Sequence, residues 1–360
     1  MKTFLEGDRI RRLLIRGTNW VGDSVMAIPA LREVRRLLPR AHITLLVLPW
    51  VSDIYQGSPW VDTVWLYDRD DRHAGTAGRF RLVRKLARGG FDAALLLQNA
   101  FEAALLTRLA GIPLRAGYRR DARGWLLTHA VSIDPRLKAR HQTYYYLDLV
   151  ERLAGRERAL DDPSPVHEKT APALPLRPED HALARQRLEQ EGVRFQGKVI
   201  GVHPGAAFGS AKRWMGDRFA QVLDRLIRTH GAEAILFGSR QERPVAEAIC
   251  GHMAARPLVL SGRTTLSELI AMIACCDLFI TNDSGPMHLA AALGIPTLAL
   301  FGSTDQVATG PLGPTAVVLN KNVECSPCLL RECPIDHRCM TRITVEEVFQ
   351  EAVRMLRAGG

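Results

Sequence analysis

Apolar and polar positions alternate along the first half of the chain in two different patterns. Short runs rich in aliphatic residues, such as 12–16 (RLLIR), 42–49 (HITLLVLP) and 91–98 (FDAALLLQ), are typical of strands buried on both faces. The segment 79–90 (RFRLVRKLARGG) instead repeats apolar residues at the spacing of an amphipathic helix. Strands that alternate with helices predict βαβ units and a parallel sheet.

A second alternating series follows a proline-rich stretch. Residues 161–179 (DDPSPVHEKTAPALPLRPE) have neither helical nor strand periodicity, which indicates a linker over 161–180. We therefore predict an α/β protein of two Rossmann-like domains, 1–160 and 181–360. A cleft between two such domains is the usual place for a small-molecule site.

Composition and charge narrow the class of protein. With 47% hydrophobic and 24% charged residues the chain is typical of a globular protein. It has no apolar run of about 18 residues and no signal-like start, so we expect a cytoplasmic protein. Its seven cysteines are then expected to be reduced. The formal charge of +10 favours anionic partners. Because no zinc-finger or RNA-binding aromatic signature is present, we expect phosphorylated ligands at a membrane face rather than nucleic acid.

Three strand ends in the second half carry polar or glycine-rich turns: 203–214 (HPGAAFGSAKRW), 237–242 (FGSRQE) and 281–288 (TNDSGPMH). The carboxyl ends of adjacent parallel strands meet at one edge, which is where such sheets bind ligands. The sequence therefore predicts a nucleotide site at this edge.

The first of these turns offers backbone and charge. Gly205 and Gly209 would let the main chain approach a phosphate, while Lys212 and Arg213 supply positive charge. The alternative is a solvated loop before an amphipathic helix, and the residues alone leave both interpretations open.

The third turn begins a helix. Asp283, Ser284 and Gly285 could hold a ribose or a diphosphate at the helix N-terminus, with His288 in the first turn. The alternative is an ordinary strand-to-helix turn with a capping residue.

One carboxylate stands out in the first half. Asp23 follows the predicted strand 12–16 and lies at the start of the next helix. It could cap that helix, or act as a general base that takes a proton from an attacking hydroxyl. Position alone does not distinguish the two roles.

The last segment with candidate chemistry is 325–339 (CSPCLLRECPIDHRC). Its four cysteines, with His337 between them, could form a closed zinc site, a local disulfide or a reduced loop. Because the spacing matches no standard zinc finger, we expect no metal. The cysteines are Cys325, Cys328, Cys333 and Cys339.

Motifs along nearly the whole chain resemble those of a known family. WVGDSVMAIPAL, GYRRDARGWLL, HPGAAFGSAKRW, NDSGPMHLAAALGIPTLALFGSTD and the cysteine-rich segment occur in this order. Together they resemble the ADP-heptose:lipopolysaccharide heptosyltransferases of glycosyltransferase family 9, most closely the heptosyltransferase II branch.

The resemblance implies a GT-B fold, with ADP-heptose on the C-terminal domain and the lipid acceptor on the N-terminal domain. It also implies inversion at the anomeric carbon without a metal or another cofactor. In this sequence the family's catalytic aspartate corresponds to Asp23. Its nucleotide-sugar motifs correspond to Lys212, Asp283, Gly285 and His288, and we add Gly205 and Ser284 from the turns described above.

We therefore expect transfer of heptose from ADP-heptose to a phosphorylated heptose–Kdo lipid A acceptor at the cytoplasmic face of the inner membrane. A basic loop would hold acceptor phosphates or carboxylates, unless it is only a solvated loop. Its members are Arg115, Arg119, Arg120 and Arg123.

Other functions remain open. The chain could use another nucleotide-heptose or another core acceptor, or it could bind a nucleotide without catalysis. A dinucleotide-dependent oxidoreductase would need a GxGxxG turn with an acid about 20 residues later, and neither half contains one.

Overall fold

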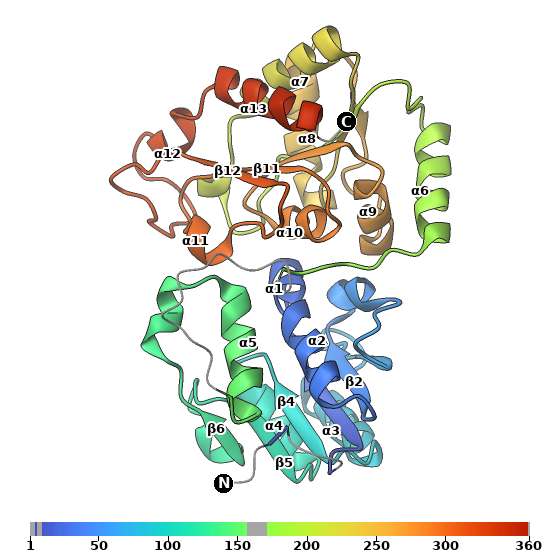
Figure 1. Ribbon diagram of the computed structural model, residues 1–360, viewed down its shortest axis with the longest axis vertical. Helices are drawn as coiled ribbons and strands as arrows, with labels where there is room; N and C mark the ends of the chain where they lie inside the picture. Colours follow the sequence, from blue (N-terminus) through green and yellow to red (C-terminus); the bar gives the residue numbers. More distant parts are fainter. Residues whose placement is uncertain (1–3, 6–8, 157–170, 359–360) are drawn as a thin grey trace. The chain divides into compact units, whose positions relative to one another are not determined.

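The computed structural model describes residues 4–5, 9–156 and 171–358, and the chain divides into two units, Met1–Thr170 and Ala171–Gly360 (Figure 1). Half of the predicted linker, residues 161–170, lies outside the described residues, and the boundaries 1–160, 161–180 and 181–360 stay a prediction. The two units are described separately below.

The first unit contains a six-stranded parallel sheet in the order β3-β2-β1-β4-β5-β6. Strand β1 lies at the centre, where Leu14 is paired with Thr44 on one side and Ala94 on the other. The predicted strands over 12–16, 42–49 and 91–98 are confirmed. The strands are β1 (Arg12–Arg16), β2 (His42–Val47), β3 (Thr63–Leu66), β4 (Ala93–Leu96), β5 (Leu114–Tyr118) and β6 (His129–Val131).

Helices cover both faces of this sheet. Helices α2 and α5 lie over one face and α3 and α4 over the other (Figure 1). The aliphatic side chains between the layers are buried, which is why the strands have apolar residues on both faces. The helices are α1 (Val21–Met26), α2 (Ile28–Leu37), η1 (Pro49–Tyr55), α3 (Gly75–Arg88), α4 (Phe101–Leu109), η2 (Gly124–Leu126), η3 (Pro135–Ala139) and α5 (Gln142–Leu153).

The second unit repeats this topology in the order β12-β11-β10-β7-β8-β9, again with parallel strands. Strands β10, β7 and β8 are neighbours, so the three polar turns predicted to share an edge do so. The strands are β7 (Val199–His203), β8 (Glu233–Leu236), β9 (Leu258–Val259), β10 (Leu278–Asn282), β11 (Thr297–Phe301) and β12 (Ala316–Asn320).

The helices of the second unit begin and end at recognisable signals. Helix α7 ends at Gly231, whose φ of 61° is in the left-handed region. Helix α9 begins with a capping box between Thr265 and Glu268. The helices are α6 (Pro178–Gln190), η5 (Ser210–Lys212), α7 (Gly216–His230), η6 (Arg240–Glu242), α8 (Arg243–His252), α9 (Leu266–Ile273), α10 (Gly285–Ala292), α11 (Gln306–Thr309), α12 (Arg338–Thr341) and α13 (Val345–Ala358).

Both sheets have the strand order of a Rossmann fold, and their pairing in one chain confirms the predicted GT-B architecture. In each sheet the order in which successive strands are added reverses at a switch point, between β1 and β4 in the first unit and between β7 and β10 in the second. Ligands of such sheets bind at the carboxyl ends of the strands beside the switch point. Within the described parts of the chain, no helix is both long and apolar enough to cross a bilayer.

Candidate functional site

The switch point of the second unit is held together by one amide side chain. Asn282, at the end of β10, donates from Nδ2 to the carbonyl oxygen of Pro204 at 2.7 Å. Its Oδ1 accepts from the backbone N–H of Trp214 at 3.0 Å. Asn282 is fully buried, so these bonds fix the loop after β7 against the end of β10.

A charged cluster lies on this support. The Lys212 ammonium is 2.6 Å from Asp283 Oδ2, and the Thr304 hydroxyl donates to the same oxygen at 2.6 Å. Lys212 also lies 5.0 Å from the centre of the Phe208 ring. Asp283 is only 6% exposed, so its charge is balanced by an ammonium group with little screening by water. The structure thus brings together the predicted Lys212 and Asp283.

Helix α10 begins beside this cluster, at Gly285 as predicted. Its N-cap, Ser284, has an extended backbone and makes no side-chain cap bond; the Ser284 hydroxyl pairs instead with the Thr281 hydroxyl at 3.1 Å. The first N–H groups of the helix therefore have no side-chain cap among the described residues. His288 is buried one turn into the helix. This helix start can accept an anion.

Glu242 belongs to this site, although it was not among the site residues predicted from the sequence. Its carboxylate lies 3.4 Å from His203 Nε2 and accepts from the Ser239 backbone N–H at 2.8 Å. Burial tends to raise the pKa of Glu242, but the hydrogen bond and charge of His203, together with Ser239, lower that pKa to about 2. Ser239 and Glu242 form a capping box, a spacing readable in FGSRQE.

Gly205 is explained by the same carboxylate. A Cβ atom at Gly205 would lie 2.0 Å from Glu242 Oε1, so any larger residue here would displace the Glu242 carboxylate. Gly209 is similar, because a Cβ there would lie 2.2 Å from the carbonyl oxygen of Arg331. Contact of the Gly205 backbone with a phosphate remains a prediction.

The cysteine-rich segment supports this loop from behind. The Arg331 carbonyl accepts from the backbone N–H of Ala211 at 3.0 Å, and His337 Nε2 lies 2.9 Å from the Ala211 carbonyl oxygen. Among the described residues no group of His, Cys, Asp or Glu side chains is arranged to hold a metal ion. Cys325, Cys328, Cys333 and Cys339 are free thiols, the first two exposed.

In the first unit Asp23 lies in the loop-and-helix region that follows β1, beside the switch point. It is the third residue of α1, whose N-cap is Trp20 and which has no side-chain cap bond. The Tyr146 hydroxyl, from α5, donates to Asp23 Oδ1 at 3.1 Å. Burial raises the pKa of the Asp23 carboxyl, an effect that the Tyr146 hydrogen bond only partly offsets. Asp23 thus makes no side-chain cap bond, although it is the acidic residue in the first turn of α1, and its raised pKa suits a general base.

Tyr146 was not predicted as a partner of Asp23 because the two residues are 123 positions apart in the sequence. It is 4% exposed, and burial, together with the charge of Asp23, raises its own pKa well above the usual range. The only local signal is its place in the tyrosine run 144–146, which carries no indication of its partner.

The four predicted acceptor arginines divide into two pairs. Arg115 is buried, with Nε donating to the Leu126 carbonyl at 2.8 Å. Arg123 is fully buried, with Nε donating to the Tyr118 carbonyl at 3.0 Å. Both guanidinium groups are used in main-chain contacts of this unit, so they are not placed to hold an acceptor as predicted. Arg119 and Arg120 are exposed.

Comparison with known proteins identifies a family that this chain matches. The model of glycosyltransferase family 9 (heptosyltransferase) matches residues 79–338. The chain is 30% identical over 316 residues to lipopolysaccharide heptosyltransferase 2 of Salmonella typhimurium, covering 86% of this chain and 87% of that protein. Lipooligosaccharide heptosyltransferase 2 of Haemophilus influenzae is also 30% identical, over 85% of this chain and 88% of its own length.

Solved structures with the same fold also match this chain. The structure of ADP-heptose LPS heptosyltransferase II from Escherichia coli superimposes with a TM-score of 0.81 at 28% identity, covering 96% of this chain and 99% of that one. A family 9 glycosyltransferase from Veillonella parvula superimposes with a TM-score of 0.83 at 24% identity, covering 99% of both chains, and supports the fold alone.

Proposed function

The chain belongs to glycosyltransferase family 9 and is a glycosyltransferase, and on that premise we propose that it transfers heptose from ADP-heptose to the inner core of lipopolysaccharide. The proposed acceptor is the phosphorylated heptose–Kdo lipid A portion. The observation that carries the proposal is the Asp23 carboxylate, whose pKa is raised by burial and which has a neutral phenol as its hydrogen-bond partner.

The donor is assigned to the second unit. Lys212 and the first N–H groups of α10, at Ser284 and Gly285, bind the diphosphate of ADP-heptose. Asp283 accepts hydrogen bonds from sugar hydroxyls, because a carboxylate is unsuited to contact a diphosphate. His288 donates to a phosphate or sugar oxygen, and the Gly205 backbone lies against the nucleotide.

The reaction is a single displacement. Asp23 takes the proton of the acceptor hydroxyl while the acceptor oxygen forms a bond to the anomeric carbon of heptose. The bond from that carbon to the β-phosphate oxygen breaks, ADP leaves, and the configuration at the carbon inverts. Lys212 and the start of α10 stabilise the charge that develops on the leaving diphosphate.

The acceptor is assigned to the first unit, where the exposed Arg119 and Arg120 contact its phosphates or carboxylates. Because lipid A is embedded in a bilayer, the enzyme acts in peripheral contact with the cytoplasmic face of the inner membrane. The formal charge of +10 supports contact with an anionic surface.

The test is an incubation of the purified protein with ADP-heptose and a truncated core acceptor. We expect ADP release that depends on the acceptor, and an acceptor product larger by one heptose in mass spectrometry. Turnover only with a different nucleotide-heptose or acceptor would reassign the substrates. Binding of ADP-heptose without any turnover would leave a nucleotide-binding protein and overturn the proposal.

A further inference from the structure

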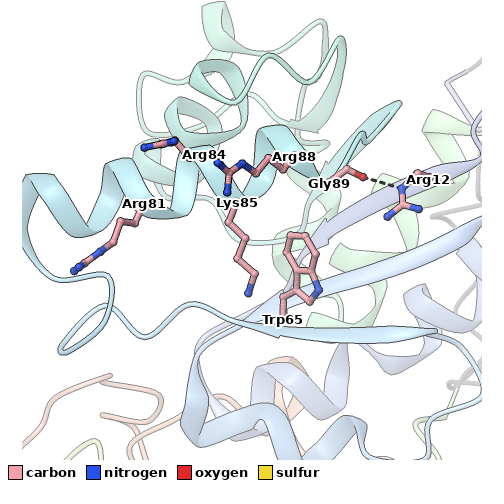
Figure 2. A pocket seen from close by; sticks show the side chains of 7 residues that line it. All are labelled: Arg12, Trp65, Arg81, Arg84, Lys85, Arg88 and Gly89. Atoms are coloured by element: carbon pink, nitrogen blue, oxygen red, sulfur yellow. Dashed lines mark hydrogen bonds between the residues drawn. The ribbon is translucent and has the colours of Figure 1, made fainter.

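A cavity of about 520 Å³ in the first unit is lined by positive charge (Figure 2). It lies between α3 and the edge of the sheet near β3. Arg12 is the first residue of β1 and Gly89 precedes β4, so the cavity is at the amino ends of these strands, away from the loops that hold Asp23. The lining residues are Arg12, Trp65, Arg81, Arg84, Lys85, Arg88 and Gly89.

The basic side chains of α3 lie on one face of the helix, at positions 81, 84, 85 and 88, which follow the helical repeat. Among the described residues none of these four has a carboxylate within ion-pair distance. Arg79, on the same helix, does: its Nε lies 2.6 Å from Glu102 Oε1. The unpaired charge is thus confined to the face that lines the cavity.

Contacts with neighbouring groups fix two of the cationic side chains that line the cavity, Arg12 and Lys85. Arg12 Nε donates to the Gly89 carbonyl at 2.7 Å, and its guanidinium carbon lies 5.9 Å from the centre of the Phe91 ring, so two contacts fix this group at the cavity wall. The Lys85 ammonium lies 4.5 Å from the centre of the Trp65 ring. Asp68 and Asp71 line a neighbouring cavity together with Lys85 but do not line this one.

The helix dipole explains only part of the pattern. Lys85 and Arg88 are in the last turn of α3, where cations complement the carbonyl end. Arg81 lies further from that end of the helix and Arg12 is on a strand, so the helix dipole does not explain why these two positions are cationic. Five cations around one concave surface instead match a ligand with several negative charges.

An apolar feature beside the groove indicates the source of that charge. Phe80, which lies one helical turn before Arg84 on the same side of α3, is 62% exposed. Exposed apolar side chains beside long basic ones are typical of surfaces that lie in the headgroup layer of a bilayer. A soluble phosphate ester gives no reason for them.

We propose that this cationic groove binds the phosphate groups of anionic phospholipid headgroups and is the surface through which the first unit contacts the membrane. The inference rests on the membrane contact in the proposed function, but not on the identity of the transferred sugar. The groove would hold the enzyme at the surface where a lipid-linked acceptor is presented.

The test compares two triple variants with the same loss of charge. Arg81→Gln/Arg84→Gln/Arg88→Gln removes charge from the groove. The control, Arg228→Gln/Arg243→Gln/Arg354→Gln, removes three positive charges from helices of the second unit. Binding is measured by co-sedimentation with phosphatidylcholine vesicles, with and without phosphatidylglycerol.

We expect the wild-type protein to bind the anionic vesicles, and the groove variant to bind them at least about tenfold more weakly, because each basic side chain near an anionic surface contributes roughly a fivefold factor. The control should stay within about twofold, because its three arginines do not line the groove. Equal weakening of both variants, or no weakening of the groove variant, would overturn the proposal.

Two further measurements separate related explanations. If soluble glycerol phosphate binds the groove while the wild-type protein fails to bind anionic vesicles, the ligand is a soluble phosphate ester and the membrane assignment is wrong. ADP release with a delipidated acceptor should be the same in the groove variant and the wild type. Loss of that activity in the groove variant would instead make the groove part of the acceptor site. If the wild-type protein itself released no ADP in this assay, the heptose-transfer proposal would fail, and the vesicle result would still decide the groove.

Discussion

The switch points of the two sheets have the same topology, but the carboxylate at each has a different kind of partner. In the first unit Asp23 has a neutral partner, the Tyr146 hydroxyl at 3.1 Å, and burial raises the pKa of the carboxyl. In the second unit Asp283 has an ammonium partner, Lys212 at 2.6 Å, and a second donor in Thr304. One strand order therefore presents a basic carboxylate in one unit and a charge-balanced one in the other.

The difference follows from what each partner does to a proton. A buried carboxylate without a cation gains affinity for protons, which a general base requires. Asp283 is instead paired with the Lys212 ammonium, an arrangement that suits a carboxylate that orients hydroxyl groups. The function at each switch point is thus set by the side chains on its loops and not by the fold.

The largest expected effect comes from removing the basic carboxylate. Asp23→Asn should lower turnover by about a hundredfold or more, because general-base catalysis contributes at least that factor. ADP-heptose affinity, measured by calorimetric titration, and the melting temperature should change little. Asp217→Asn, which alters an exposed acid in the first turn of α7, is the matched control and should keep near-wild-type turnover. Full activity in a folded Asp23→Asn protein would remove the contrast between the two sites.

The next effect concerns the charge-balanced site. Lys212→Met should weaken ADP-heptose binding by roughly 1.5–3 kcal/mol, the range for hydrogen bonds that involve a charge. It should also lower the melting temperature of the ligand-free protein, because it leaves Asp283 buried without its cation. Both quantities are measured on the purified variant, by calorimetric titration and by a thermal melt.

A double variant separates these two consequences. Lys212→Met/Asp283→Asn should recover part of the lost stability, because no uncompensated charge remains. It should not recover the affinity for ADP-heptose. If affinity returned together with stability, the cluster would be a structural ion pair and not a ligand site.

A smaller change tests the neutral partner of Asp23. The hydrogen bond from Tyr146 lowers the pKa of Asp23 against the larger effect of burial, so Tyr146→Phe should raise that pKa further. Because the base must be ionised, the acid limb of the kcat/KM profile should move to higher pH. Tyr144→Phe, on the same helix, serves as the control. An acid limb that stays in place would show that the profile reports another group.

The sequence predicted the strands best where the apolar runs were long. Strands β1, β2 and β4 appeared as such runs, β7, β8 and β10 were indicated by the polar turns at their ends, and the alternation with helices predicted parallel sheets. Strand β5 was not predicted because it contains Arg115, whose burial is made possible by carbonyl groups such as that of Leu126. Strand β12 was missed because it is only half-buried at the edge of the sheet.

The candidate site was predictable where its residues share one loop and not where they come from distant elements. Asp283, Ser284 and Gly285 lie in one turn, whose type can be read locally. The Tyr146–Asp23 contact joins residues 123 positions apart, and the Thr304 bond to Asp283 spans 21 positions. Such pairs depend on how helices pack on the sheet, which no local pattern contains.

The pH dependence of stability tests another carboxylate at the second switch point. The pKa of Glu242 in the folded protein is about 2, below its usual 4.5, so the stability that Glu242 contributes is present above pH 4.5 and is lost as the pH falls towards 2. Glu242→Gln should therefore lower the melting temperature by a few degrees at neutral pH, for a contribution on the order of 2 kcal/mol. The gap from the wild type should narrow as the pH falls below 4.5. A gap independent of pH would show that packing around Gly205, and not charge, is what Glu242 provides.

The smallest expected effects concern the segment behind the charge-balanced site. His337 Nε2 contacts the Ala211 carbonyl, next to Lys212, whereas Cys325 and Cys328 are exposed thiols. If the segment holds the loop through main-chain contacts, His337→Ala should weaken ADP-heptose binding severalfold, about the value of one ordinary hydrogen bond. Cys325→Ser/Cys328→Ser and treatment with a chelator should leave both affinity and melting temperature unchanged. A metal content near one equivalent, lost with the cysteines together with stability, would contradict this account, because the loop that carries Lys212 would then depend on a coordinated ion.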